Sequence, residues 1–469
     1  MTFEQLRLKH PKLVYKSYRV TQNNTSLSIT YEFLLEPDID FQSTVTIPFS
    51  GVVEEYILAP FVFNLGLVEA LSYWKLAAPK EFVIEAGVLD AEQIRFWYDL
   101  FIHGLGEFYY RNQIDFTKDD FLHIRSAEGS RKNIWDPSVA QEVSHERATH
   151  GRSPADLVLV GGGKDSSVVL GIMKQSDRTL QTMVLNPTRA ALDNIQTGRF
   201  PPPLVIFRVI DPKMPELNRA GYLNGHTPFS AYLAFLGVLV AALYGNENVI
   251  VSNEKSANEG NVSYHGMEVN HQYSKSFRFE TMFRQYCAAS FDDAASYFSI
   301  LRPFNDVQIG LMFTKYPHFF TTFRSCNVGA KTGMWCGTCA KCAFTYLTLS
   351  PFLSEEQMRI SFGADLFANP RITEHIRALV GLTPVKPFEC VGTRDEAKLA
   401  VILTVEKYLR EHREVPEGLL KIKSDVQVSR EDIIELRHLV LDDWGDTYNV
   451  PPEYLSMLRQ VWQSVALPT

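Results

Sequence analysis

The chain has 469 residues, of which 45% are hydrophobic and 21% charged, and its formal net charge is −8 at pH 7. A folded chain of this length is typical of about three domains. The acidic balance and the absence of long Lys/Arg runs argue against nucleic acid as the main partner. We therefore expect a small-molecule substrate.

The hydropathy of the chain argues against a secreted or membrane protein. The opening segment, MTFEQLRLKHPKLVYKS, has no apolar stretch of the kind found in secretory signals, so we expect a cytoplasmic protein. The longest apolar run extends from Phe229 to Tyr244 and is shorter than a membrane-spanning helix requires. It predicts a buried helix, and we expect no membrane partner.

Residues 1–148 predict a mixed α+β domain. Alternating apolar and polar residues indicate strands, and apolar residues at helical spacing indicate helices. The predicted strands run from Leu13 to Val20, Leu27 to Leu35 and Thr44 to Ile47, and the predicted helices from Phe61 to Ala77 and Ala91 to Leu105.

The most informative stretch of the chain is LVLVGGGKDSS, from Leu157 to Ser167. An apolar strand pattern ends at three glycines, and a polar segment then begins a helix. Glycines let backbone N–H groups approach an anion, and the N-terminus of the following helix favours phosphate. Against the alternative of an ordinary Gly-rich turn, we predict nucleotide binding by Gly161, Gly162, Gly163, Lys164, Asp165 and Ser166.

This loop is not a Walker P-loop. That motif needs a glycine five residues before Gly163 and a hydroxyl residue after Lys164, and here Val158 and Asp165 hold those positions. The loop resembles instead the S-G-G-x-D-S pattern of PP-loop ATP pyrophosphatases, with Gly161 in place of the usual serine. The resemblance implies cleavage of ATP between the α- and β-phosphates.

Strand and helix patterns alternate from Asp156 to about residue 352. Such alternation implies right-handed crossovers and a doubly wound parallel sheet with helices on both faces, which binds ligands at the carboxyl ends of its strands. We predict an α/β core of this kind, PP-loop and HUP-like, over residues 149–352. Its later strands are expected at Gln181 to Leu185, Leu204 to Val209, Asn248 to Val251 and Tyr297 to Leu301.

The last part of the chain, residues 353–469, is predicted to be helical. Strand patterns stop there, and capping boxes at Ser354 and Thr393 and a weaker helix start at Ser429 each lead into a helical pattern.

Four of the six cysteines form the series Cys326-x9-Cys336-x2-Cys339-x2-Cys342. Two-residue gaps let thiolates converge on one tetrahedral ion, and without a secretory signal such spacing favours a metal over disulfides. Zinc is the expected metal, with an iron–sulfur cluster as the alternative. The arrangement resembles the zinc knot of PP-loop queuosine-precursor synthases, so two separate segments indicate one superfamily.

A dense polar block, SNEKSANEGN, begins at Ser252 directly after a predicted strand. In a doubly wound sheet this places the block beside the phosphate loop. Asp165 and Glu254 are predicted to hold Mg²⁺ on the pyrophosphate, because hard oxygen ligands suit that ion. Against the alternative of a solvated loop, the predicted substrate-binding residues are Asn253, Asn258, Glu259, Lys275, Arg302 and Arg324.

The chain as a whole resembles the ATP-dependent UDP-N-acetylmuramoyl-L-alanyl-L-glutamate epimerases of bacterial peptidoglycan synthesis. The resemblance extends from the N-terminal domain into the C-terminal region, which implies the same architecture and activity. It is carried by HGLGEFYYRN from His103, GGGKDS from Gly161, YLNGHTP from Tyr222, SNEKSANEGN from Ser252, GMEVNHQYSKS from Gly266, LRP from Leu301, FRSCN with WCGTCAKC, and KPFECVG from Lys386.

The resemblance implies that the terminal L-glutamate of UDP-MurNAc-L-Ala-L-Glu becomes D-glutamate while ATP is converted to AMP and pyrophosphate. It also implies a ligase that adds the L-glutamate. Adenylation would mask the carboxylate charge that makes the α-proton hard to remove, so that a base could then abstract it. The acid/base candidates are Cys390, His226, His271 and Lys255, which the sequence does not rank.

Two rival classes stay open at this point. The first is a PP-loop adenylating enzyme that acts as a ligase or modifies a nucleobase or tRNA. A tRNA substrate would need a basic face, which the net charge of −8 does not support. The second is a non-catalytic regulator in which the glycine loop senses ATP.

Overall fold

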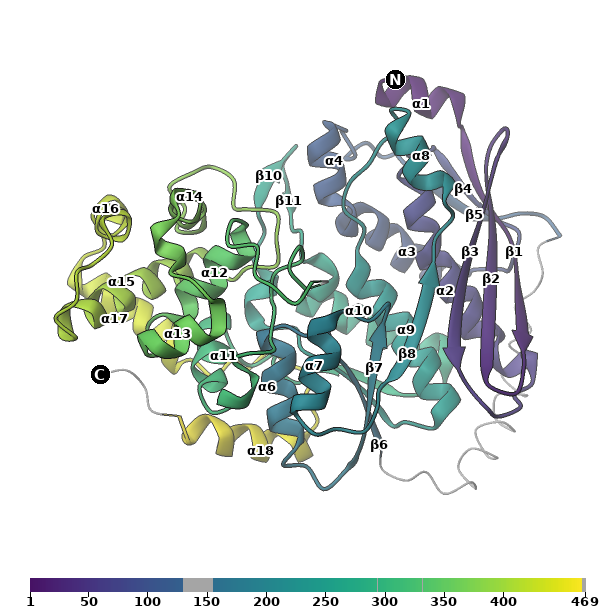
Figure 1. The fold of residues 1–469 in the computed structure, drawn as a ribbon. Coiled ribbons are helices and arrows are strands. Elements are labelled where there is room, and N and C mark those ends of the chain that lie inside the picture. The colour runs from purple at the N-terminus through teal and green to yellow at the C-terminus, as the bar shows by residue number, and fades with distance from the viewer. Residues whose placement is uncertain (130–154, 293, 331, 466–469) are drawn as a thin grey trace.

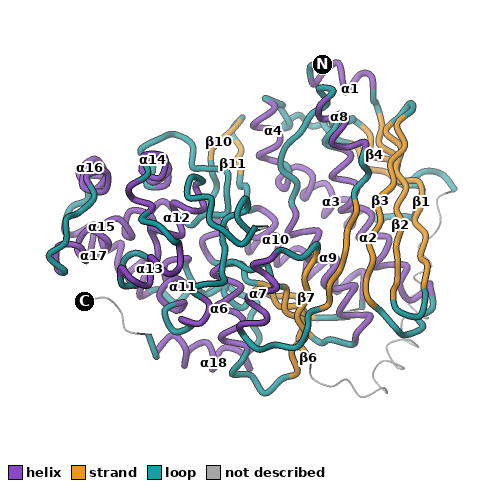
Figure 2. The backbone as a smooth tube through the Cα atoms, viewed as in Figure 1, coloured by secondary structure: helices purple, strands orange, loops and turns teal. Residues whose placement is uncertain are grey.

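The computed structural model describes residues 1–129, 155–292, 294–330 and 332–465. Within this part of the chain the fold is mixed α/β, with one ten-stranded sheet, a small hairpin and many helices. Figure 2 shows the strands gathered towards one side of the molecule and a helical region at the other. The predicted boundary at residues 148 and 149 lies outside the described residues.

The strands confirm most of the predicted ones and add four short ones. The large sheet has the order β12-β9-β6-β7-β8-β3-β2-β1-β4-β5, and β10 pairs with β11. Their bounds are β1 (Lys12–Gln22), β2 (Ser26–Leu35), β3 (Ile39–Pro48), β4 (Glu81–Ile84), β5 (His123–Ser126), β6 (Ala155–Leu159), β7 (Thr179–Leu185), β8 (Leu204–Val209), β9 (Asn248–Val251), β10 (Val262–Tyr264), β11 (Met267–Val269) and β12 (Ser296–Ser299).

Five neighbouring strands, β8-β7-β6-β9-β12, are parallel and follow the order 3-2-1-4-5 along the chain, as in doubly wound sheets. Alternate side chains of the β6 segment enter different cores. Leu157 and Leu159 pack with helix α9 (Phe229–Tyr244), whereas Val158 and Val160 pack with helix α6 (Lys164–Met173). Both faces are covered, which confirms the predicted large, mostly parallel sheet.

The N-terminal strands extend this same sheet. β3 pairs antiparallel with β8, with Thr46 opposite Phe207, and β1 pairs in parallel with β4. β4 and β5 have four residues each, too few for alternation to identify them in the sequence. The predicted N-terminal domain is therefore joined to the predicted nucleotide-binding domain through main-chain hydrogen bonds.

Two long apolar helices lie inside the protein. Helix α2 (Glu55–Trp74) is long and apolar enough to cross a membrane, but 94% of its apolar window is buried in the fold, where it packs against α9. Helix α9 is the buried helix predicted from the run at Phe229 to Tyr244. Both helices act as core elements beneath the sheet.

The remaining helices of the first 320 residues surround the sheet (Figure 1). They are α1 (Phe3–Lys9), α3 (Ala91–Gly104), α4 (Gly106–Asn112), α7 (Arg189–Thr197), α8 (Lys213–Arg219), α10 (Phe277–Phe291) and α11 (Asp306–Phe313), with single turns at Lys255–Asn258, Tyr273–Lys275 and Pro317–Phe319.

The C-terminal region is helical, as predicted, and the capping boxes at Ser354 and Thr393 and the helix start at Ser429 are confirmed. The last helix returns to the sheet, because the Tyr454 hydroxyl donates to Asp156 Oδ2 (2.8 Å) at the start of β6. The helices are α12 (Ala340–Leu349), α13 (Glu355–Phe362), α14 (Pro370–Leu379), α15 (Arg394–Arg410), α16 (Glu417–Val426), α17 (Arg430–Arg437) and α18 (Pro452–Gln463), with single turns at Leu366–Ala368 and His438–Asp442.

Candidate active site

A cavity of about 420 Å³ opens at the carboxyl ends of β6, β7 and β9. Its wall is continued by the loop before the cysteine-rich segment and by the segment around Cys390. This is the edge at which doubly wound sheets bind ligands. The predicted residues that line it are Gly161, Gly163, Lys164, Asp165, Ser166, Asn253, Glu254, Lys275, Arg324 and Cys390.

The glycine loop has the geometry expected between a strand and a helix. Gly162 has φ +85°, and a Cβ there would lie 2.4 Å from the backbone nitrogen of Ala191. Only glycine fits this position without strain. At Gly161 a Cβ would meet only Ser166 Oγ, at an ordinary 3.7 Å, so a serine would fit. The glycine that stands where the PP-loop pattern has serine is therefore a chemical difference from that pattern and not a steric one.

Carboxylates and lysines lie close together beside the glycine loop. The buried Lys164 Nζ lies 2.5 Å from Asp165 Oδ1 and 2.7 Å from Asp306 Oδ1. Burial alone would lower the pKa of Lys164, but these two carboxylates raise it, so the ammonium is charged. Burial also raises the pKa of Asp306 and of Glu254, despite the attraction of Lys164 and Lys275.

These carboxylates fit a hard divalent cation. Glu254 is 2% exposed, and its Oε2 atom accepts no hydrogen bond from any residue that the structure describes. A buried carboxylate oxygen without a partner is costly and is satisfied by a cation. Asp165, partly exposed and on the same cavity wall, could share that cation with substrate phosphates.

The cavity wall also contains Cys390. Burial would raise the pKa of Cys390, but Lys275, Lys341 and a hydrogen bond with His271 lower it well below its usual range. Lys275 itself hydrogen-bonds with Cys390 and is attracted by Glu254 and Asp165. Cys390 is thus held as a thiolate, the form in which cysteine acts as a base or nucleophile.

Behind Cys390, two histidines meet one carboxylate. The Nδ1 atom of His271 lies 2.5 Å from Glu107 Oε2, and Nδ1 of His226 lies 3.8 Å from the same oxygen. Burial alone would lower the pKa of His271, but hydrogen bonds with Cys390 and Glu107 raise it to about 9. Burial and the nearby His271 charge lower the pKa of His226 to about 3. One imidazole is therefore charged and the other neutral.

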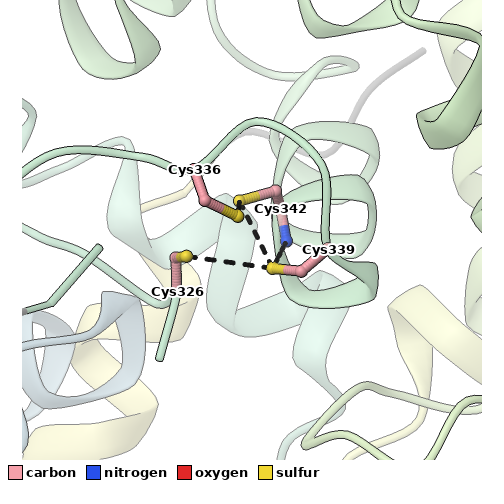
Figure 3. Close-up of side chains that lie close together, drawn as sticks. All are labelled: Cys326, Cys336, Cys339 and Cys342. Carbon is pink, nitrogen blue, oxygen red and sulfur yellow. Dashed lines mark hydrogen bonds between the residues drawn. The ribbon is translucent and has the colours of Figure 1, made fainter. Parts of the chain in front are cut away.

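The four clustered cysteines converge on one point (Figure 3). Three of their sulfur pairs are 3.5 to 3.8 Å apart, and all four sulfurs lie within 4.8 Å of one another. The edge of a ZnS₄ tetrahedron with ~2.3 Å bonds is about 3.8 Å, so the spacing fits one zinc ion. The six cysteines, all in the described part, form no disulfide.

The cysteine cluster is joined to the glycine loop. Directly before Cys326, Ser325 Oγ accepts from the Lys164 N–H (3.1 Å), and the Arg324 N–H donates to the Gly162 carbonyl (2.8 Å). Lys341, between two of the clustered cysteines, lines the cavity. Its Nζ donates to Asn327 Oδ1 at 3.2 Å. The cluster therefore supports one wall of the cavity.

Arg324 lines the cavity, but its guanidinium is engaged. Its Nε donates to the Gly333 carbonyl (2.9 Å) and its Nη1 to the Phe323 carbonyl (2.6 Å). The guanidinium of Arg324 therefore stabilises the cavity wall, and these two contacts occupy donors that an anion would use.

Seven of the predicted catalytic, nucleotide-binding and substrate-binding residues do not line the cavity: Gly162, His226, His271, Lys255, Asn258, Glu259 and Arg302. The last four are held by contacts elsewhere. Lys255 forms an ion pair with Asp443, and Glu259 pairs with the buried Lys386 at 2.9 Å. Asn258 accepts from a backbone N–H at the start of α10. Arg302 is 1% exposed and binds Glu280 together with the carbonyls of Glu254 and Lys275. Each of these four side chains holds the surrounding loops and does not line the cavity, so the catalytic role expected of Lys255 and the substrate-binding role expected of the other three stay predictions.

Four residues at the site were not selected from the sequence: Glu107, Asp306, Ser325 and Lys341. Glu107, Ser325 and Lys341 lie inside segments that carry the family resemblance, which was the available signal. Asp306 had no such signal, since an acidic residue in the first turn of a helix is common on any surface.

A cavity at the carboxyl ends of parallel strands, with a glycine loop and several charged side chains in its wall, is the feature expected of a ligand-binding α/β protein of the doubly wound class. Two family models match the sequence, the MurL N-terminal domain over residues 5–300 and the MurL C-terminal domain over residues 321–432. The chain belongs to the MurL family. No solved structure matches it.

Similar proteins carry the name UDP-N-acetyl-alpha-D-muramoyl-L-alanyl-L-glutamate epimerase. The protein from Salinispora tropica is 32% identical over 370 residues, which are 78% of this chain and 78% of its own. The protein from Xanthomonas oryzae pv. oryzae is 34% identical over 351 residues, 73% of this chain and 74% of its own. The family resemblance found in the sequence segments is confirmed.

Proposed function

We propose that this protein is an isomerase that inverts the terminal L-glutamate of UDP-MurNAc-L-Ala-L-Glu to D-glutamate, with ATP converted to AMP and pyrophosphate. The names of the relatives support the epimerase activity and the class of substrate. One observation supports the chemistry. Lys275 is bound to Cys390 and attracted by Glu254 and Asp165, so a thiolate base and a phosphate-type end share one cavity.

The first half of the reaction uses the glycine-loop end. The α-carboxylate of the substrate attacks the α-phosphorus of ATP, a C–O–P linkage forms, and pyrophosphate leaves. The loop N–H groups and the N-terminus of α6 favour the phosphate charge. Asp165 and Glu254 would hold Mg²⁺, with Asp306 beside them, and Mg²⁺ supplies neutralisation of that charge.

The second half uses the Cys390 end. In the acyl-adenylate the carboxylate charge is masked, so loss of the α-proton no longer adds charge to an anion. The Cα–H bond breaks toward the Cys390 sulfur, and the electron pair delocalises into the acyl group. A proton returned to the opposite face inverts the centre, and water releases AMP.

We also propose one structural zinc ion on Cys326, Cys336, Cys339 and Cys342, since all four sulfurs belong to the protein and leave no open position for substrate. The consumption of ATP favours a cytoplasmic location. The L-glutamyl substrate must come from a reaction that forms an amide to L-glutamate, which is the work of a ligase.

Deuterated water tests the proposed function. The purified protein is incubated with ATP, Mg²⁺ and UDP-MurNAc-L-Ala-L-Glu, and we expect D-glutamyl product that carries deuterium at Cα, together with AMP. Omission of ATP should abolish both. Inversion without ATP would refute the activation step, and AMP release without change at Cα would indicate a ligase or hydrolase instead.

A further inference from the structure

Glu107 is a buried carboxylate with an unusual set of partners. It is 5% exposed and lies in the first turn of α4, between Gly106 and Phe108. One carboxylate oxygen pairs with Arg111, and the other faces the two imidazoles of His271 and His226. Neither half of the proposed reaction uses this carboxylate.

Glu107 reaches the reacting end of the cavity through His271. Nδ1 of His271 donates to Glu107 Oε2, and the same imidazole hydrogen-bonds with Cys390. A carboxylate that accepts from Nδ1–H fixes the orientation of an imidazole ring. Glu107 therefore holds His271 in the position in which its ring also contacts the thiol of Cys390. The order carboxylate, imidazole, thiol is the arrangement that activates cysteine nucleophiles and bases.

We propose that Glu107, His271 and Cys390 form a proton relay in which Glu107 is a positioning residue that keeps His271 protonated and Cys390 ionised. The Cys390 S–H bond breaks, its proton moves to His271, and the resulting thiolate is free to take the α-proton of the substrate. Glu107 gains no proton and balances the imidazolium charge. The role in epimerisation rests on the proposed function, but the ionisation of Cys390 does not.

The surrounding charges are consistent with this relay. Cys390 also faces Lys275 and Lys341, which favour the thiolate, and Glu389 and Glu254, which oppose it. The ring of His226 packs on that of His271 at 4.3 Å between centroids. His226 is neutral, so the single negative charge of Glu107 is left to His271 and Arg111.

The direct test is the pH dependence of Cys390 alkylation by iodoacetamide, followed by mass spectrometry of the peptide that contains Cys390. No substrate or ATP is needed. In the wild-type protein the rate should be near its plateau at pH 7. In Glu107→Gln and in His271→Gln the midpoint should move up by at least about one pH unit, with about a tenfold lower rate at pH 7. The matched control is Glu92→Gln, an exposed carboxylate on α3, which should behave as wild type.

Glu107→Asp keeps the charge, so its alkylation midpoint should shift less than that of Glu107→Gln. This comparison separates a charge effect from a general loss of packing. Coincident alkylation profiles for Glu107→Gln and wild type would overturn the relay, whatever the protein catalyses. A second equivalent of bound zinc in the wild type that is lost in Glu107→Gln would also overturn it, because the three side chains would then be metal ligands.

The two hypotheses fail separately. If the alkylation profile shifts but no inversion at Cα occurs in any variant, the relay stands and the proposed function falls. If both the relay and the proposed function are correct, Glu107→Gln should lower the rate of inversion at Cα. The acid side of the pH profile of that rate should move to higher pH, and the rate of AMP formation should fall less than the rate of inversion.

Discussion

The side chain of Ser325 accepts a hydrogen bond from the backbone N–H of Lys164 at 3.1 Å. This contact joins two motifs that lie 161 residues apart in the chain, the glycine loop and the segment that leads into the cysteine cluster. The cysteine cluster, which is proposed to hold a structural zinc ion, therefore supports the wall of the cavity that is proposed to bind ATP, and changes at the cluster should alter the glycine loop.

Replacement of Asp165 by asparagine should lower the rate of AMP formation by about 10²-fold or more. The change removes a carboxylate that is proposed to hold Mg²⁺ and keeps the volume of the side chain. AMP release is measured with substrate and ATP, and folding by circular dichroism. Asp177→Asn, at an exposed position in the turn after α6, is the control. Wild-type turnover in Asp165→Asn would remove this residue from the site.

The glycine loop offers a matched pair of variants. Gly162→Ala places a Cβ against the backbone of Ala191 at a positive φ, so we expect destabilisation by about 1–3 kcal/mol and weaker ATP binding. Gly161→Ser has room and introduces the hydroxyl typical of related loops, so stability should change little and ATP binding should hold or improve. Equal thermal midpoints for the two variants would contradict the loop geometry.

The cysteine cluster should carry about one zinc per colourless chain, measured by elemental analysis. Cys339→Ser should lose the metal and lower stability by several kcal/mol, on the order expected for a structural site. It should also weaken ATP binding through the Ser325 contact. Cys287→Ser, outside the cluster, should keep its zinc. A brown protein that contains iron and sulfide would show that the alternative metal centre is correct.

Cys390→Ala should separate the two half-reactions. Adenylation does not use the thiol, so AMP or pyrophosphate exchange should persist, while inversion at Cα should fall by about 10²- to 10⁴-fold. The measurement is the deuterium content and configuration of the glutamyl residue. Unimpaired epimerisation in this variant would transfer the role of base to another group in the cavity.

Asp306 should make stability depend on pH. Burial raises the pKa of this carboxyl above its unfolded value near 4, so above that pH the folded state binds more protons than the unfolded state. Stability is then lost as pH rises from about 4 towards neutrality, with a slope of at most about 1.4 kcal/mol per pH unit. Without added Mg²⁺, Asp306→Asn should remove this contribution, so that its thermal midpoint falls less from pH 5 to 7 than that of the wild type. An equal change of the two midpoints over this pH range would contradict this account.

Much of the local structure is determined by the sequence. Alternation and helical spacing identify the long strands and the buried helix α9, and the Gly-rich loop and the cysteine spacing identify two parts of the site, because those patterns depend on near neighbours in the chain. Glycine at position 162 and thiols two residues apart have few other physical interpretations.

The tertiary structure alone decides what those parts do together. The join of β3 to β8, the burial of Glu107 beside His271, and the removal of Lys255 and Arg302 from the cavity depend on contacts between residues far apart in the chain. A charged residue has the same local pattern whether it lines a cavity or holds a loop, since only its partners in space differ. For that reason the sequence leaves four acid/base candidates equal, whereas the fold places Cys390 in the cavity wall next to His271, which supports the proposal that Cys390 is the base.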